Sequence, residues 1–166
     1  MKKTINLLIL IILLIMTGCD RKKDMDDPYA ANLAAAIDAY IQNEISAGES
    51  LPLMQRVQND ILKEITYTIQ EFNVTEGTMT VEFTYVDVLE LADSITDTNI
   101  TEEEYYRYCI ERLSSGQQKM ITESIQVSFE PSEMGYSIIG SEPLTNVLTG
   151  GVLYYYMELL EGIGYE

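Results

Sequence analysis

The chain has 166 residues, with ten lysines and arginines against 27 aspartates and glutamates, and it contains no histidine and no tryptophan. The net charge of −17 argues against nucleic acid as a partner, because binding phosphate needs clustered cationic side chains. Without histidine, the usual zinc sites and the Ser-His and Cys-His nucleophile pairs are excluded as well.

The N-terminal segment has the three parts of an export signal. Lys2 and Lys3 form a basic start, residues 5–16 form an apolar run with Asn6 near its edge, and small residues precede Cys19. The run is shorter than the ~20 residues that a membrane-spanning helix needs. The short run and the basic residues 21–23 argue against the alternative, an ordinary N-terminal membrane helix.

Residues 16–19, Met-Thr-Gly-Cys, resemble the lipobox of bacterial lipoprotein signals, with methionine in place of the commoner leucine at the first position. The resemblance implies cleavage before Cys19, a diacylglyceryl group on its sulfur, and a new amine open to acylation, for example by palmitate. Two or three acyl chains hold a protein firmly, since each buried methylene contributes about 0.8 kcal/mol. We therefore expect a signal peptide at 1–18, a lipidated cysteine and tether at 19–28, and one domain at 29–166 on the extracytoplasmic side of a bacterial cell membrane.

The predicted domain differs from its tether in charge. Residues 29–166 carry five basic and 23 acidic side chains, a net charge of −18, whereas residues 20–28 carry three basic and four acidic ones. An anionic lipid surface repels such a domain over a Debye length of ~8 Å, and the tether reaches at most ~30 Å. We expect the domain to stay close to the bilayer without lying on it. The alternative is that the acidity serves solubility alone.

Hydrophobic periodicity and capping residues predict the elements of this domain. In chain order, we expect a helix from 28 to about 47, a helix over 53–62, strands over 65–70 and 79–85, helices over 88–95 and from 102 to about 115, strands over 123–129 and 136–139, and helices over 143–148 and 152–160. Both strand pairs are expected to be hairpins. Hairpins imply an antiparallel sheet with one face covered by helices, and therefore an α+β fold.

This order of elements, with the stretches 81–95, 102–113 and 144–160, resembles small Gram-positive lipoproteins that carry an NTF2-like (cystatin-like) α+β domain. The resemblance covers residues 29–163. It implies a curved antiparallel sheet that forms a cone around a pocket, and a homodimer through the open sheet face. That superfamily includes enzymes, transport factors and domains without an assigned activity, so the fold does not imply one function.

Asp87 is the candidate catalytic residue. It continues the parity of the apolar residues at 79–85, so it should lie on their face at the end of the strand. A carboxylate at the mouth of an apolar cone would have a raised pKa and could act as a general base, as in isomerases of the superfamily. The alternative is structural, with Asp87 as an N-cap and Glu90 as the third residue of the helix.

The loop at 93–104 has part of the spacing of a calcium-binding EF-hand. Its residues at loop positions 1, 5, 7, 9 and 12 are Asp93, Asp97, Asn99, Thr101 and Glu104. However, Ile95 occupies the third position, and Thr98 replaces the glycine required at the sixth. A capping box already explains Thr101 and Glu104. We therefore expect no metal site and no cofactor, with Asp93, Asp97 and Glu104 as the only candidate ligands.

Cys109 and two groups of tyrosines each have a structural interpretation. Cys109 has no intramolecular partner once Cys19 is lipidated, and we interpret it as a small core residue on an apolar helix. Tyrosines cluster at 105–108 and 154–156, where they either pack a helix against the sheet or form a contact surface.

Three functions are compatible with these residues. We favour a non-catalytic binding or interaction module that uses the sheet face or cone, because no set of catalytic residue types converges. The first alternative is a small isomerase or hydrolase that uses Asp87 with a tyrosine such as Tyr85. The second is a structural or assembly lipoprotein whose acidic surface attracts cations or cationic partners.

Overall fold

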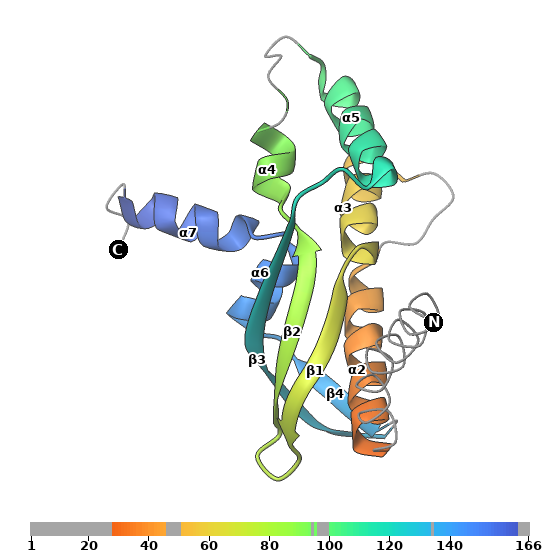
Figure 1. The fold of residues 1–166 in the computed structure, drawn as a ribbon, viewed down its shortest axis with the longest axis vertical. Helices are drawn as coiled ribbons and strands as arrows, with labels where there is room; N and C mark the ends of the chain where they lie inside the picture. The colour runs from red at the N-terminus through yellow and green to blue at the C-terminus, as the bar shows by residue number, and fades with distance from the viewer. Residues whose placement is uncertain (1–27, 46–50, 94, 96–99, 134, 163–166) are drawn as a thin grey trace, which may run out of the picture.

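The computed structural model describes residues 28–45, 51–93, 95, 100–133 and 135–162 (Figure 1). These residues form the helices α2 (Pro28–Glu44), α3 (Leu53–Lys63), α4 (Val88–Asp93), α5 (Glu102–Ser115), α6 (Glu142–Leu148) and α7 (Val152–Gly162), and the strands β1 (Thr66–Asn73), β2 (Thr78–Val86), β3 (Met120–Ser132) and β4 (Gly135–Ile139). The predicted α+β class and the predicted order of elements are confirmed. The proposed signal peptide and Cys19 lie outside the described residues. No helix in the described part of the chain combines the length and apolar character needed to span a bilayer.

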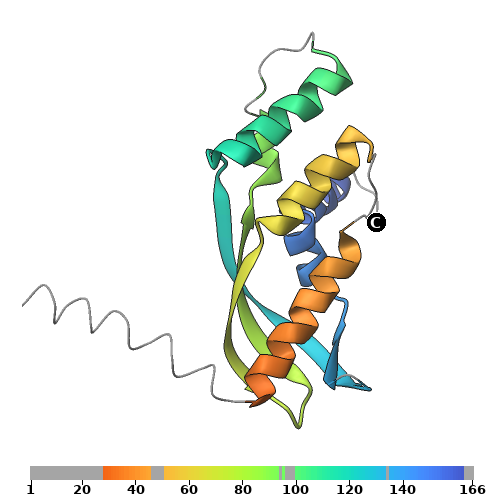
Figure 2. The same cartoon turned by 90° about the vertical axis from the view of Figure 1, so that its right-hand side faces the viewer.

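The four strands form one antiparallel sheet in the order β1-β2-β3-β4. In its middle, Val81 of β2 pairs with Ile69 of β1 and Ile125 of β3, which places apolar side chains together on one face. A bulge between Ile69 and Glu71 shifts the register of β1. Figure 2 shows the sheet bending around α2. The sheet nevertheless stays open, so the cone expected from the NTF2-like resemblance is not found.

The main core lies between the concave face of the sheet and the helices α2 and α6. The Tyr67 hydroxyl joins β1 to α2: it donates to the Asp38 carboxylate at 2.7 Å and lies 2.9 Å from the Ala34 carbonyl oxygen. The buried residues of this core are Leu33, Ala36, Ile37, Ile41, Met79, Val81, Phe83, Tyr85, Val127, Phe129, Ile138, Leu144 and Val147. Because these residues alternate along the strands, the opposite face of the sheet is polar. It exposes Thr66, Thr68, Gln70, Thr122, Ser124 and Gln126.

A second, smaller apolar cluster lies at one end of the sheet, where α3, α4 and α5 meet (Figure 1). The buried residues of this cluster are Val57, Ile61, Val86, Leu91, Cys109 and Leu113. Cys109 is a free thiol, and burial raises its pKa above the ordinary value. The interpretation of Cys109 as a core residue is therefore confirmed.

Candidate binding site

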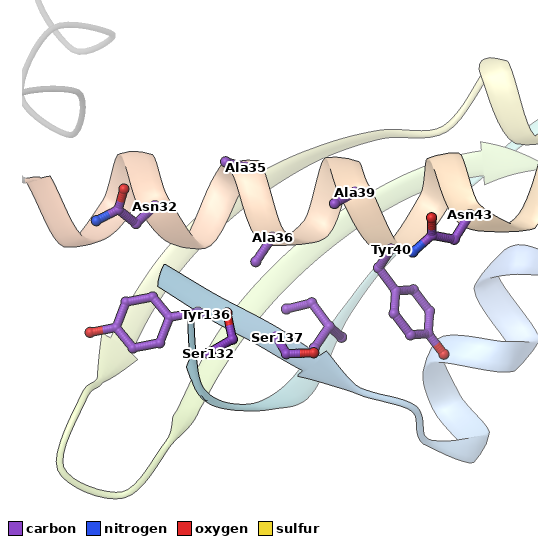
Figure 3. Close-up of a pocket in the computed structure, with 10 residues that line it drawn as sticks. Asn32, Ala35, Ala36, Ala39, Tyr40, Asn43, Ser132, Tyr136 and Ser137 are labelled. Atoms are coloured by element: carbon purple, nitrogen blue, oxygen red, sulfur yellow. The ribbon is translucent and has the colours of Figure 1, made fainter. Parts of the chain in front are cut away.

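A groove of about 360 Å³ runs between α2 and β4 (Figure 3). The helix contributes residues spaced three and four apart, which lie on one face: Asn32, Ala35, Ala36, Ala39, Tyr40 and Asn43. The alanines leave room between helix and strand because their side chains end at Cβ. Figure 3 shows Tyr136 and Tyr40 toward opposite ends of the groove. The ring of Tyr136 is held by an edge-to-face contact with Phe129, at a centroid distance of 5.1 Å.

Strand β4 supplies the other wall and an open edge. It pairs with β3 through residues 128–132, and no other described strand lies on its second side. An edge strand presents backbone N–H and C=O groups that an additional strand can pair with. The side chains that line the groove are alanine, asparagine, serine, tyrosine and isoleucine, and none of them is charged at neutral pH. The groove therefore suits an extended, uncharged stretch of polypeptide.

The sequence does not predict this groove; its pattern favours a ligand surface on the sheet face or in a cone. The groove depends on α2 lying against β4, about a hundred residues later in the chain. One signal was present: alanine recurs along one side of α2, at positions 35, 36 and 39. Small residues at helical spacing indicate that something approaches the helix closely there, but they do not identify what does.

Asp87 is buried directly after β2, and both of its carboxylate oxygens are engaged. Oδ1 accepts the backbone N–H of Glu90 at 3.0 Å, so the predicted N-cap is confirmed. Oδ2 accepts a hydrogen bond from Lys119 Nζ at 2.8 Å. Burial by itself raises the pKa of Asp87, but Lys119 and the backbone N–H groups of the cap outweigh it, so the pKa is lowered. A general base would need the opposite shift.

Tyr85 does not form a pair with Asp87. Its hydroxyl is buried and donates to the Glu123 carboxylate on β3 at 2.8 Å. Burial and this hydrogen bond both raise the pKa of Tyr85. Glu123 has the same parity along β3 as the apolar residues 125, 127 and 129. The structure shows that it satisfies the one buried polar atom of Tyr85.

The candidate metal ligands are only partly described. Asp97 and Asn99 lie outside the described residues, and Asp93 is exposed at the end of α4. Thr101 and Glu104 form the predicted capping box: the Thr101 N–H donates to Glu104 Oε2 at 2.8 Å, and the Glu104 N–H donates to Thr101 Oγ1 at 3.2 Å. Within the described ranges, no three or more cysteine, aspartate or glutamate side chains are grouped so that they could hold a metal ion.

No family model, no curated protein and no solved structure matches this chain. The resemblances to bacterial lipoproteins and to NTF2-like domains stay expectations drawn from the residues that carry them.

Proposed function

We propose that this chain is a lipoprotein fixed to the extracytoplasmic face of a bacterial cell membrane, with a domain that serves as a non-catalytic interaction module. The lipobox-like residues 16–19 support the anchor, because acylation of Cys19 would hold the chain at the bilayer after cleavage. The tether leads directly into α2, the helix that forms one wall of the groove. The charge of −18 on residues 29–166 favours a domain held off an anionic leaflet, with the α2–β4 groove in water.

The open edge of β4 beside α2 is the observation that carries the binding function. A partner segment that enters the groove in extended form would pair its main chain with β4 and place small side chains against Ala35 and Ala39. The enzyme alternative has less support, because both oxygens of Asp87 are used by the helix cap and by Lys119. The ligand that such an interaction module would bind is therefore an extended protein segment.

The anchor is tested by replacing Cys19 with serine in cells grown with labelled palmitate. We expect the unchanged chain to incorporate label, to be cleaved and to sediment with membranes. The Cys19→Ser chain should lose the label completely and stay uncleaved, because the thiol that accepts the diacylglyceryl group is gone. An unlabelled parent chain, together with a Cys19→Ser chain that is cleaved as before, would contradict the anchor.

The groove is tested by filling it. We place a photoreactive amino acid at Ser137 and compare Ala39→Trp, which occupies the groove, with Ala31→Trp, an exposed alanine of α2 outside it. Ala39→Trp should reduce the adducts formed with partner proteins in intact cells about tenfold, equivalent to about 1.4 kcal/mol of binding free energy. Ala31→Trp should leave them unchanged. Adducts that respond equally to both substitutions would show that the groove is not the binding site.

A further inference from the structure

Helix α7 has an apolar surface that nothing in the described chain covers. Its sequence, VLYYYMELLEG, contains eight apolar or aromatic residues, yet none of residues 152–161 is buried. Tyr155, Tyr156, Leu159 and Leu160 are 45–59% exposed. Figure 1 shows α7 projecting away from the sheet and from the other helices. A helix that exposes this much apolar surface is normally buried against protein or lipid, so α7 is expected to have a partner.

A matching apolar groove lies at the base of α7. Its volume is about 430 Å³, and it lies between α3, α4 and α5, lined mainly by Val57, Ile61, Leu91, Tyr105 and Cys109. Val152, the first residue of α7, forms part of the same lining. Apolar surface therefore continues from this α3–α4–α5 groove onto α7, and both halves of a contact are present in one chain.

The junction before α7 keeps the helix pointing away from its own chain's groove. Asn146 is buried in α6 and accepts hydrogen bonds from two backbone N–H groups. Its backbone carbonyl oxygen accepts the N–H of Gly151 at 2.9 Å, and its side-chain Oδ1 accepts the N–H of Tyr154 at 3.0 Å. The Gly150 N–H donates to the Val147 carbonyl oxygen, and the Gly150 carbonyl oxygen accepts a hydrogen bond from the Val88 N–H. Closing α7 onto its own groove would break these bonds, whereas docking α7 on another molecule leaves them intact.

Charge also favours a second copy over a lipid surface. All five basic residues of the domain lie on α3, on α5 or directly after α5: Arg56, Lys63, Arg107, Arg112 and Lys119. The charged side chains of α7 are Glu158 and Glu161, and it has no base to meet anionic lipid. Helices α3, α4 and α5 also carry seven acidic residues, so what they offer Glu158 and Glu161 of α7 is an individual base and not a net positive charge. Arg56 is exposed there and makes no ion pair with any described residue.

We propose that α7 of one copy docks in the α3–α4–α5 groove of a second copy, so that two chains exchange their C-terminal helices in a symmetric dimer. Each chain then supplies one helix and one groove, and the contact is formed twice. This dimer differs from the one expected from the NTF2-like resemblance. The open sheet face exposes threonine, serine and glutamine, whereas α7 exposes tyrosine and leucine.

Disulfide trapping in isolated membranes tests the exchange with the full chain. Cys109→Ser is introduced throughout to remove the native thiol of the groove. One copy carries Met54→Cys at the rim of the groove, and a second copy with a different tag carries Leu159→Cys on α7. The matched control carries Ile139→Cys on β4 instead, since Ile139 is 43% exposed and Leu159 is 45% exposed. After mild oxidation we expect about tenfold more dimer carrying both tags with Leu159→Cys than with Ile139→Cys, because docking raises the local thiol concentration.

Four results would overturn the exchange. The first is equal cross-linking of the Leu159→Cys and Ile139→Cys copies, which indicates random collision. The second comes from one chain that carries both Met54→Cys and Leu159→Cys: an internal disulfide without dimer shows that α7 occupies its own groove. The third is no cross-link in either arrangement. A control pair keeps Met54 in the first copy and Leu159→Cys in the second, and it should form no disulfide-linked dimer. A dimer that persists in this control comes from another thiol, such as an unmodified Cys19, and also contradicts the exchange.

Discussion

Replacing Gly150 with alanine is expected to lower the free energy of unfolding by about 3 kcal/mol. Gly150 is buried between α6 and α7 with φ of +64°, a conformation that side chains with a Cβ rarely adopt. An added Cβ would collide with Val88 Cγ2 and would lie 2.8 Å from the Val86 carbonyl oxygen. The backbone oxygen cannot turn away as a flexible side chain would, so the junction itself has to shift. Urea unfolding of the domain, expressed from residue 26, measures the effect as a lower midpoint at constant slope.

Gly116 provides the matched control, because it has nearly the same φ angle without the crowding. Its φ is +66° at the C-cap of α5, and a Cβ there would meet no heavy atom within 4 Å. Gly116→Ala should therefore cost only the conformational penalty, about 1 kcal/mol. Equal losses for Gly116→Ala and Gly150→Ala would show that the close approach of Val88 and Val86 contributes nothing.

Local signals in the sequence predicted the elements well, because each signal acts over a few residues. The capping box at Thr101 set the start of α5, and the alternation in 79–85 identified β2 to within one residue at each end. The predicted bounds of a strand were wrong where backbone pairing extends past the residues used to predict it. Strand β3 runs from Met120 to Ser132, well beyond the predicted 123–129, because residues 120–122 still pair with β2 and residues 130–132 still pair with β4. Helix α6 begins one residue early, since the Ser141 side chain caps it.

The candidate sites depend on contacts between distant segments, which periodicity does not encode. The α2–β4 groove needs the sheet to bend until its last strand reaches α2, and a cone would have satisfied the same alternation of side chains. Asp87 illustrates a different limit. Its cap was predictable from Glu90 three residues later, but its partner Lys119 lies 32 residues away. That ion pair, which the local pattern does not reveal, lowers the pKa of Asp87 and removes the reason to regard it as a base.

Helix α7 shows the limit most clearly, because its apolar residues look like core in the sequence. Leu33 of α2 and Leu159 of α7 are both apolar helix residues, yet Leu33 is 0% exposed and Leu159 is 45% exposed. Leu33→Ala should lower the free energy of unfolding by about 3 kcal/mol, since it leaves a cavity against the sheet. Leu159→Ala should change it by less than about 0.5 kcal/mol in dilute protein. Urea unfolding of the same domain compares the two leucines.

Measuring the free energy of unfolding at several protein concentrations distinguishes a residue of the monomer core from a residue that contacts a second copy. A monomer core residue has the same effect at every concentration, so the Leu33→Ala loss should stay constant. If helices are exchanged between copies, the parent chain becomes more stable as its concentration rises, and the difference caused by Leu159→Ala grows with it. If Leu159→Ala lowers the free energy of unfolding as much as Leu33→Ala does in dilute protein, α7 belongs to the monomer core, contrary to its exposure. Because four of the nine exposed large apolar residues in the described part of the chain lie on α7, the covering of this helix decides whether the chain acts as one copy or as two.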